Sequence, residues 1–324
     1  MASPIVLSLY YWLKPGIPRK VVFALRKALA RRKVKKVSSF WPIDPKAGEP
    51  PPGWRGWPGG KRFAFVLTHD VETAQGQRKC VKLAQLEMDL GFRSSFNFVA
   101  EGYDVDRKLH GFLTENGFEI GVHGLKHSGN MFVPAKRFFS EAPRINHYLR
   151  AWGAVGFRAP SMYRDFSLIH YLDILYDSSS FDVDPFEPLG RGLETIFPVF
   201  ISNSHNSAKG AHVKDTKVDS RETLSGFVEL PYTLPQDHTL FFVLGEKDTS
   251  IWKRKLHWIC EKGGMALLNV HPDYMRFDSG ENPSLTYPCE LYREFLEHVR
   301  SHYEGLFWHA LPKEIAAFVK EHLG

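Results

Sequence analysis

The sequence predicts an α/β protein built around a parallel sheet. From Arg62 onward, short apolar runs alternate with stretches of helical periodicity, and strands that alternate with helices form parallel sheets. The 324 residues are 43% hydrophobic and 24% charged, which offsets the entropy of ordering the chain and excludes a disordered or fibrous protein. The three cysteines have no metal-binding spacing, so neither a disulfide scaffold nor a thiolate cluster is expected. The alternation alone leaves two architectures open, a barrel and a doubly wound sheet.

The individual elements follow from the apolar patterns in chain order. The run FAFVLT at 63–68 is typical of a buried strand, and the helical pattern over 77–90 ends at Gly91. The elements expected next are strands at 95–99, 119–122 and 154–157, with helices at 106–116 and 135–150. The C-terminal part is expected to contain strands at 239–244, 265–270 and 306–308, with helices at 249–262, 287–302 and 312–322.

Residues 1–41 are predicted to form a basic amphipathic helical arm. Residues 1–43 hold ten basic and no acidic side chains, and apolar residues recur among them at roughly helical spacing. The rest of the chain carries 32 basic and 36 acidic side chains, a net charge of −4, so no nucleic-acid partner is expected. Two interpretations stay open: residues 1–40 dock on an anionic membrane surface, or the helix packs on the domain with its basic face solvated.

A segment rich in proline and glycine, residues 42–60, separates the arm from the main domain. Its six prolines and five glycines predict a linker or a strap, and Trp54 and Trp57 indicate that it is pinned to the domain. The main domain is expected over 61–324, with a polar insert at 202–226.

The N-terminal sequence predicts neither export nor a membrane span. The apolar run at 2–13 is about a dozen residues long where a bilayer span needs roughly 20, and positive charge follows the run instead of preceding it. We therefore expect a cytoplasmic protein, peripheral on the inner face of the membrane if the arm docks there.

Ionisable side chains collect directly after four of the predicted strands. Asp70 and Glu72 follow the strand at 63–68, His123 and His127 follow 119–122, Arg158 follows 154–157, and His271 follows 265–270. The carboxyl ends of parallel strands are where barrel and other α/β enzymes assemble their active sites. We therefore expect these side chains to form one site.

The segment THDVE at 68–72 places two acids on one face of the chain. If the strand continues, its period of two directs Thr68, Asp70 and Glu72 to one side and His69 to the other. Two neighbouring carboxylates repel each other unless a cation or a proton lies between them. A metal ion bound by one carboxylate, with the other left as a base, would satisfy both.

The segment HGLKH at 123–127 spaces two histidines four residues apart. In a helical turn both imidazoles would reach the same point, which is the spacing of metal-binding helices. Together with a nearby carboxylate, His123 and His127 are a candidate site of two histidines and one acid that leaves open positions for water.

The ordered set THDVE, HGLKH, FRAPSMY and LLNVHPDY resembles the NodB-type polysaccharide deacetylases, carbohydrate esterase family 4. The resemblance covers roughly residues 61–275 and implies a distorted (β/α)7 barrel. It implies that one divalent metal ion, zinc most of all but also cobalt or nickel, is held by Glu72, His123 and His127. It further implies Asp70 as general base, His271 as general acid, and Arg158 as the group that orients Asp70.

The sequence departs from the commonest form of the first motif, which has two adjacent aspartates. Here Val71 separates Asp70 from Glu72, and glutamate is longer than aspartate. If Glu72 is not a ligand, Asp70 binds the metal and its assignment as base fails. The acid that orients His271 is also open, with Asp248 and Asp273 as candidates.

The resemblance implies a metal-dependent hydrolase that removes the N-acetyl group of an amino sugar in a polysaccharide or a lipid-linked saccharide, such as a precursor in surface polysaccharide assembly. Candidate substrate contacts are Tyr163, Tyr274 and Asp182, since sugar clefts combine aromatic faces with polar groups. Two alternatives stay open. One is a divergent relative that binds a sugar or hydrolyses an amide without a metal, and the other is an O-deacetylase or deformylase acting on a lipid-linked sugar.

Overall fold

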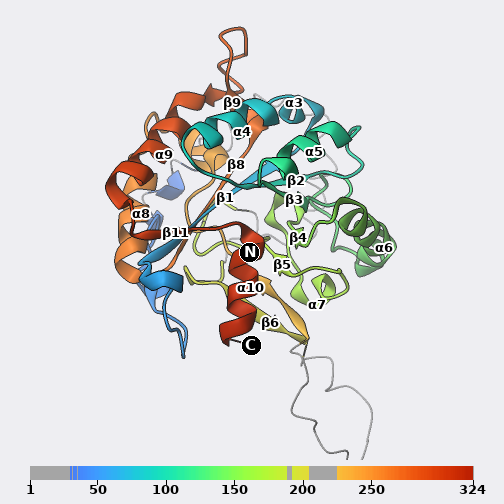
Figure 1. The fold of residues 1–324 in the computed structure, drawn as a ribbon, viewed down its shortest axis with the longest axis horizontal. Coiled ribbons are helices and arrows are strands. Elements are labelled where there is room, and N and C mark those ends of the chain that lie inside the picture. The colour runs from blue at the N-terminus through green and yellow to red at the C-terminus, as the bar shows by residue number, and fades with distance from the viewer. Residues whose placement is uncertain (1–29, 31, 35, 188–191, 204–224, 324) are drawn as a thin grey trace, which may run out of the picture.

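Nine strands form one twisted sheet in the computed structural model, which describes residues 30, 32–34, 36–187, 192–203 and 225–323 (Figure 1). The strands are β1 (Phe63–Val71), β2 (Ser95–Phe98), β3 (Glu119–Val122), β4 (Gly156–Phe157), β5 (Tyr176–Asp177), β6 (Val199–Ser202), β7 (Gly226–Glu229), β8 (Met265–Val270) and β11 (Phe307–His309). A separate two-stranded sheet pairs β9 (Met275–Arg276) with β10 (Tyr287–Pro288).

The parallel strands close into a distorted barrel. They follow the order β1-β2-β3-β4-β5-β7, and β8 pairs with β1 on the side away from β2. The ring is completed by a single bridge between Leu234, beyond the end of β7, and Leu268 of β8. The ring therefore has seven strands, and the predicted α/β fold, a distorted (β/α)7 barrel, is confirmed. β11 pairs with the start of β1, and β6 pairs with β7 as an antiparallel edge strand.

Helices cover the outside of the barrel, and one helix packs across one of its ends. They are α3 (Ala74–Gln77), α4 (Cys80–Asp89), α5 (Arg107–Glu115), α6 (Ala135–Trp152), α7 (Phe166–Ile169), α8 (Ser250–Lys262), α9 (Cys289–Tyr303) and α10 (Pro312–Leu323). In Figure 1, α10 crosses in front of the sheet, whereas α4, α5, α8 and α9 lie around its rim. Ile315 of α10 packs in one buried cluster with Val66 of β1 and Leu267 of β8, so apolar side chains fill this end of the barrel.

Two of the predicted elements are wrong in type or extent. The run at 239–244 is a π-helix (His238–Leu244) instead of a strand, because a short run of apolar residues satisfies a strand and a buried helix equally well. The helix expected over 77–90 is divided into α3, which Thr73 caps, and α4. Helix α4 ends shortly before Gly91, whose φ is 82°.

The segment 42–60 lies against the domain as a strap. The Trp57 indole donates to the carbonyl of Gly263 at 2.8 Å, and its ring centroid is 4.7 Å from that of Trp54. Of the arm, Val37 and Trp41 are buried on the domain, while residues 1–29 lie outside the described residues. Most of the polar insert also lies outside them. The insert connects β6 to β7, and Ser202 of β6 is the partner of Gly226 of β7 in their antiparallel pairing. Within the described ranges, every helix is too short or too polar to cross a membrane.

Candidate active site

The predicted site residues meet at the carboxyl ends of β1, β3, β4 and β8. Thr68 and Asp70 project to the same side of β1, as their spacing predicts. His69 points away from them and bonds Glu87 at 2.8 Å in the buried layer beneath the outer helices. The period of two thus places Thr68 and Asp70 in the site and His69 in the core, although all three belong to one strand.

Asp70 is a buried carboxylate with donors on both oxygens. Its Oδ1 accepts from Arg158 Nη1 at 3.1 Å and from Asn97 Nδ2 at 3.0 Å, while its Oδ2 accepts from Asn269 Nδ2 at 2.9 Å. Burial alone would raise the pKa of Asp70, but the Arg158 guanidinium and the other neighbours hold this pKa well below its usual value. Asp70 is therefore ionised. Asn97 and Asn269 were not predicted, since asparagines inside strands carry no local signal of a site.

Arg158 is completely buried and held at every nitrogen. Its Nε donates to the Ser178 carbonyl at 2.7 Å and its Nη2 donates to the Ser178 hydroxyl at 2.5 Å. Its Nη1 also reaches Thr68 Oγ1 at 2.9 Å and Asn269 Oδ1 at 2.5 Å. The guanidinium cannot swing away from Asp70 without losing several of these bonds, so it fixes the orientation of that carboxylate.

The two histidines of HGLKH come together without the helical turn expected for them. The chain leaves β3 at His123 and turns at Gly124, whose φ is 67° and whose Cβ, were there one, would lie 2.9 Å from Pro160. This turn brings the ring centroids of His123 and His127 to 5.2 Å. The two imidazoles therefore converge, although the chain between them forms a turn and not a helix.

His123 presents its free ring nitrogen to the site. Its Nδ1 is 3.0 Å from the carbonyl of Arg158, and since a carbonyl can only accept, Nδ1 carries the proton. Burial lowers the pKa of His123 to about 4, so the ring is neutral and the lone pair on Nε2 is available.

Glu72 completes the cluster from the end of β1. Its Oε1 lies 3.2 Å from His127 Nε2, and its Oε2 accepts from the Tyr274 hydroxyl at 2.9 Å. Although burial opposes ionisation, His127 holds the pKa of Glu72 well below its usual value.

His271 faces the cluster from the end of β8. Its Nε2 lies 3.9 Å from Asp70 Oδ2 and 3.8 Å from Glu72 Oε1. Its Nδ1 is 2.7 Å from Asp237 Oδ1, and its backbone N–H donates to Asp237 Oδ2 at 2.8 Å. Burial would lower the pKa of His271, but Asp237 raises it to about 10, so the imidazole carries a proton on the nitrogen that faces the site.

The acid that orients His271 is thus Asp237, and neither predicted candidate takes this part. Asp248 is nearly fully solvated and caps Ser250 through its backbone N–H. Asp273 bonds the backbone N–H of Glu72 and the hydroxyl of Thr73. Asp237 was missed because it lies 34 residues from His271 and meets it only through the fold.

The three predicted substrate contacts lie in different surroundings. Tyr274 is in the site, where its hydroxyl bonds Glu72. Tyr163 is half-buried and follows the turn Pro160–Met162, two residues of which have positive φ. Asp182 is fully buried and pairs with Lys255 at 2.7 Å, so it presents no open surface to a sugar.

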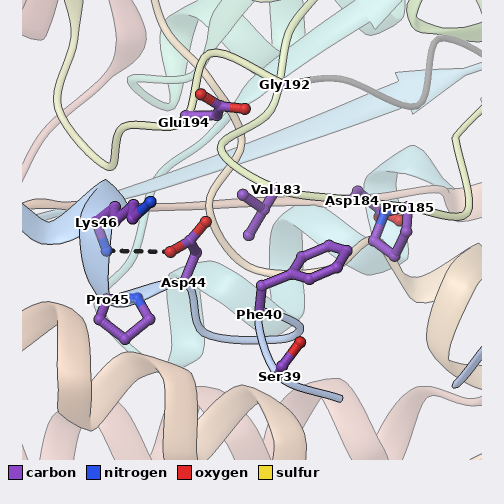
Figure 2. Close-up of a pocket in the computed structure, with 10 residues that line it drawn as sticks. All are labelled: Ser39, Phe40, Asp44, Pro45, Lys46, Val183, Asp184, Pro185, Gly192 and Glu194. Atoms are coloured by element: carbon purple, nitrogen blue, oxygen red, sulfur yellow. Dashed lines mark hydrogen bonds between the residues drawn. The ribbon is translucent and has the colours of Figure 1, made fainter. Parts of the chain in front are cut away.

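The residues after Asp182 line a different pocket. Its volume is about 490 Å³, and its walls come from the end of the arm (Ser39, Phe40), from the strap (Asp44, Pro45, Lys46) and from residues 183–185, 192 and 194 (Figure 2). None of the residues lining this pocket belongs to the cluster around Asp70.

The donor set around Glu72 fits a divalent metal ion in its chemistry. His123 is neutral and Glu72 is ionised, as ligands must be. Although burial opposes it, Glu72 raises the pKa of His127, so an ion would bind there by displacing the His127 proton. Two ligands about 2.1 Å from a tetrahedral ion are about 3.4 Å apart, close to the 3.2 Å between Glu72 Oε1 and His127 Nε2. As they stand, no three such side chains in the described part of the chain are arranged to hold an ion.

Solved structures share this fold, although no protein-family profile and no curated protein matches the sequence. A Mycobacterium smegmatis protein assigned as a polysaccharide deacetylase has a TM-score of 0.59 and 20% identity, over 84% of this chain and 95% of that one. A Pseudomonas aeruginosa PAO1 protein with the same assignment has a TM-score of 0.58 and 16% identity, over 82% of this chain and 93% of that one. Puue allantoinase has a TM-score of 0.59 and 15% identity, over 87% of this chain and 98% of that one. The chain thus has the polysaccharide deacetylase fold that its motifs predicted.

Proposed function

We propose that this protein is a metal-dependent hydrolase that removes the N-acetyl group of an amino sugar in a polysaccharide or a lipid-linked saccharide. One observation carries the proposal: an ionised acid, Asp70, and a protonated imidazole, His271, face each other at 3.9 Å beside two histidines and a second carboxylate. Amide hydrolysis requires a base for the attacking water and an acid for the departing nitrogen, both close to the same acyl carbon. The fold shared with the polysaccharide deacetylases supports the substrate class.

The residues of the chain divide the reaction between them. Asp70 takes a proton from the attacking water, and Arg158 holds its carboxylate in place. His271 gives its Nε2 proton to the departing nitrogen, because an amine cannot leave as an anion. Asp237 keeps that proton on the ring and fixes its direction.

Glu72, His123 and His127 would hold the divalent ion, most of all zinc. When bound, such an ion lowers the pKa of water and polarises the acyl oxygen. His123 is prepared for this part by its hydrogen bond to the Arg158 carbonyl, which fixes the tautomer as the second partner of a ligating histidine usually does.

The test of the reaction is a panel of N-acetylated amino sugars and their oligomers, assayed for acetate and free amine. The proposal expects equal amounts of both products, and loss of both in a His271→Gln variant. In a parallel panel, acetate without amine from O-acetylated sugars would indicate an O-deacetylase, and formate from N-formylated sugars would indicate a deformylase. No product from any N-acylated sugar would contradict the proposal.

A metal-independent amide hydrolase or a sugar-binding protein is a second candidate, because Glu72 and His127 already contact each other directly. In that arrangement the pair neutralises the second carboxylate without an ion. The allantoinase with the same fold shows that the fold is not confined to saccharide deacetylases. Turnover that survives exhaustive chelation would favour the metal-independent hydrolase, and sugar binding without any turnover would favour the sugar-binding protein.

The proposed location is the inner face of the membrane, with residues 1–40 on anionic lipid. The support is the charge pattern of the arm, ten basic and no acidic side chains up to residue 43. Binding to phosphatidylserine vesicles should disappear in high salt and weaken on deletion of residues 1–29, which removes five of the ten basic side chains. Binding that is indifferent to both would exclude this location.

A further inference from the structure

Tyr274 lies where the chain turns back after His271. The 3₁₀ turn Pro272–Tyr274 directs the Tyr274 hydroxyl to Glu72 Oε2 at 2.9 Å. The Tyr274 ring packs beside His271 and His238, with centroids 5.1 and 5.5 Å away, and the Tyr274 side chain is partly buried. The same turn therefore carries the proposed acid and a contact to the proposed metal ligand.

The residue before Tyr274 holds the backbone of Glu72. Asp273 Oδ2 accepts from the Glu72 N–H at 2.9 Å, and its Oδ1 accepts from the Thr73 hydroxyl at 2.5 Å. Gly76 leaves room for this contact, since a Cβ there would lie 2.1 Å from Asp273 Oδ2. The main chain of Glu72 is thus fixed by Asp273, and only its side chain needs a further restraint.

That side chain needs a restraint because glutamate has one more rotatable bond than aspartate. An unrestrained carboxylate loses more conformational entropy when it binds an ion. The Tyr274 hydroxyl occupies Oε2 and leaves Oε1 directed at His127, 3.2 Å away.

We propose that Tyr274 is a positioning residue that fixes the Glu72 carboxylate so that Oε1 is available to the metal ion. The proposal rests on the metal site of the proposed function. It assigns the Tyr274 hydroxyl to the carboxylate and not to the substrate. Groups that orient a ligand typically change metal affinity by 10- to 100-fold when they are removed.

The test compares Tyr274→Phe with Tyr176→Phe in the full chain. Tyr176 is a matched control, because its hydroxyl also bonds a buried glutamate inside the barrel, Glu119 at 2.9 Å, but it contacts none of the proposed ligands. Each protein is stripped of metal, and its Kd for zinc is measured by competition with a chromophoric chelator. Thermal midpoints of the stripped proteins monitor folding, and kcat and KM are measured on any substrate found.

We expect Tyr274→Phe to raise the Kd for zinc by about 10-fold or more, and Tyr176→Phe to leave it within about threefold. If the wild type binds zinc and Tyr274→Phe binds it equally well, the positioning role is wrong while the metal site stands. A raised KM at unchanged Kd would overturn the role in favour of a substrate contact. A wild type that binds no metal would overturn both this proposal and the metal-dependent function.

Discussion

Replacement of Glu119 by glutamine should stabilise the protein, and the gain should grow with pH. Glu119 is 4% exposed at the start of β3, where it accepts from the Tyr176 hydroxyl at 2.9 Å and from the Lys313 N–H at 3.1 Å. Burial raises the pKa of Glu119 from 4.5 to about 7. Glutamine can keep both contacts, because its oxygen can accept from the Lys313 N–H while its amide donates to the Tyr176 oxygen.

The size of the gain follows from the two pKa values. Below pH 4.5 the Glu119 carboxyl is protonated in both the folded and the unfolded chain, so it does not lower the free energy of unfolding. Between pH 4.5 and 7 only the unfolded chain ionises, so the wild type loses stability as the pH rises. Above pH 7 the loss is complete, at about 3 kcal/mol for a difference of about 2.5 between the pKa values.

The assay is denaturant unfolding of wild type and Glu119→Gln at pH 4.5, 6 and 8. The free energy of unfolding of the variant minus that of the wild type should rise by about 3 kcal/mol across this range. Other titrating groups act on both proteins alike and cancel in the difference. A difference that is flat with pH, or that falls, would refute the reasoning.

Further variants test single parts of the site. Asp70→Asn should reduce kcat by about 100-fold or more while zinc stays bound; full turnover, measured beside metal content, would exclude Asp70 as base. Arg158→Met should lower the free energy of unfolding by about 3–5 kcal/mol, because it leaves a carboxylate buried without its cation; a denaturation curve like that of the wild type would contradict this. Asp237→Asn should reduce kcat at neutral pH with little change in KM, and an unchanged kcat would show that His271 needs no partner. Gly124→Ala should cost at least about 1–3 kcal/mol, given its φ of 67° and the nearby Pro160, and a thermal midpoint equal to that of the wild type would count against the turn.

The sequence was most informative where strands are buried and end in polar residues. The strand predicted at 63–68 and the one at 265–270 are β1 and β8, because strands buried on both faces are continuously apolar. The period of two within THDVE correctly separated Asp70 from His69. The order of the motifs along the chain also predicted the barrel.

The parts that the sequence did not reveal depend on contacts between distant segments. β5 and β7 were missed because each is short and carries a buried acid, Asp177 or Glu229, where an apolar residue is expected. The π-helix was mistaken for a strand because its apolar run has no decisive period. Asp237, which precedes it, meets His271 only because the chain just before it pairs with β8, at Leu234 and Leu268.

The metal content of the untagged protein tests the central claim most directly. Elemental analysis of wild type beside a His123→Ala/His127→Ala double variant should find about one divalent ion per wild-type chain and none in the variant. No ion in either protein, even after incubation with zinc, cobalt or nickel, would contradict a metal-dependent hydrolase. The direct contact between Glu72 and His127 would then be the working form of the site.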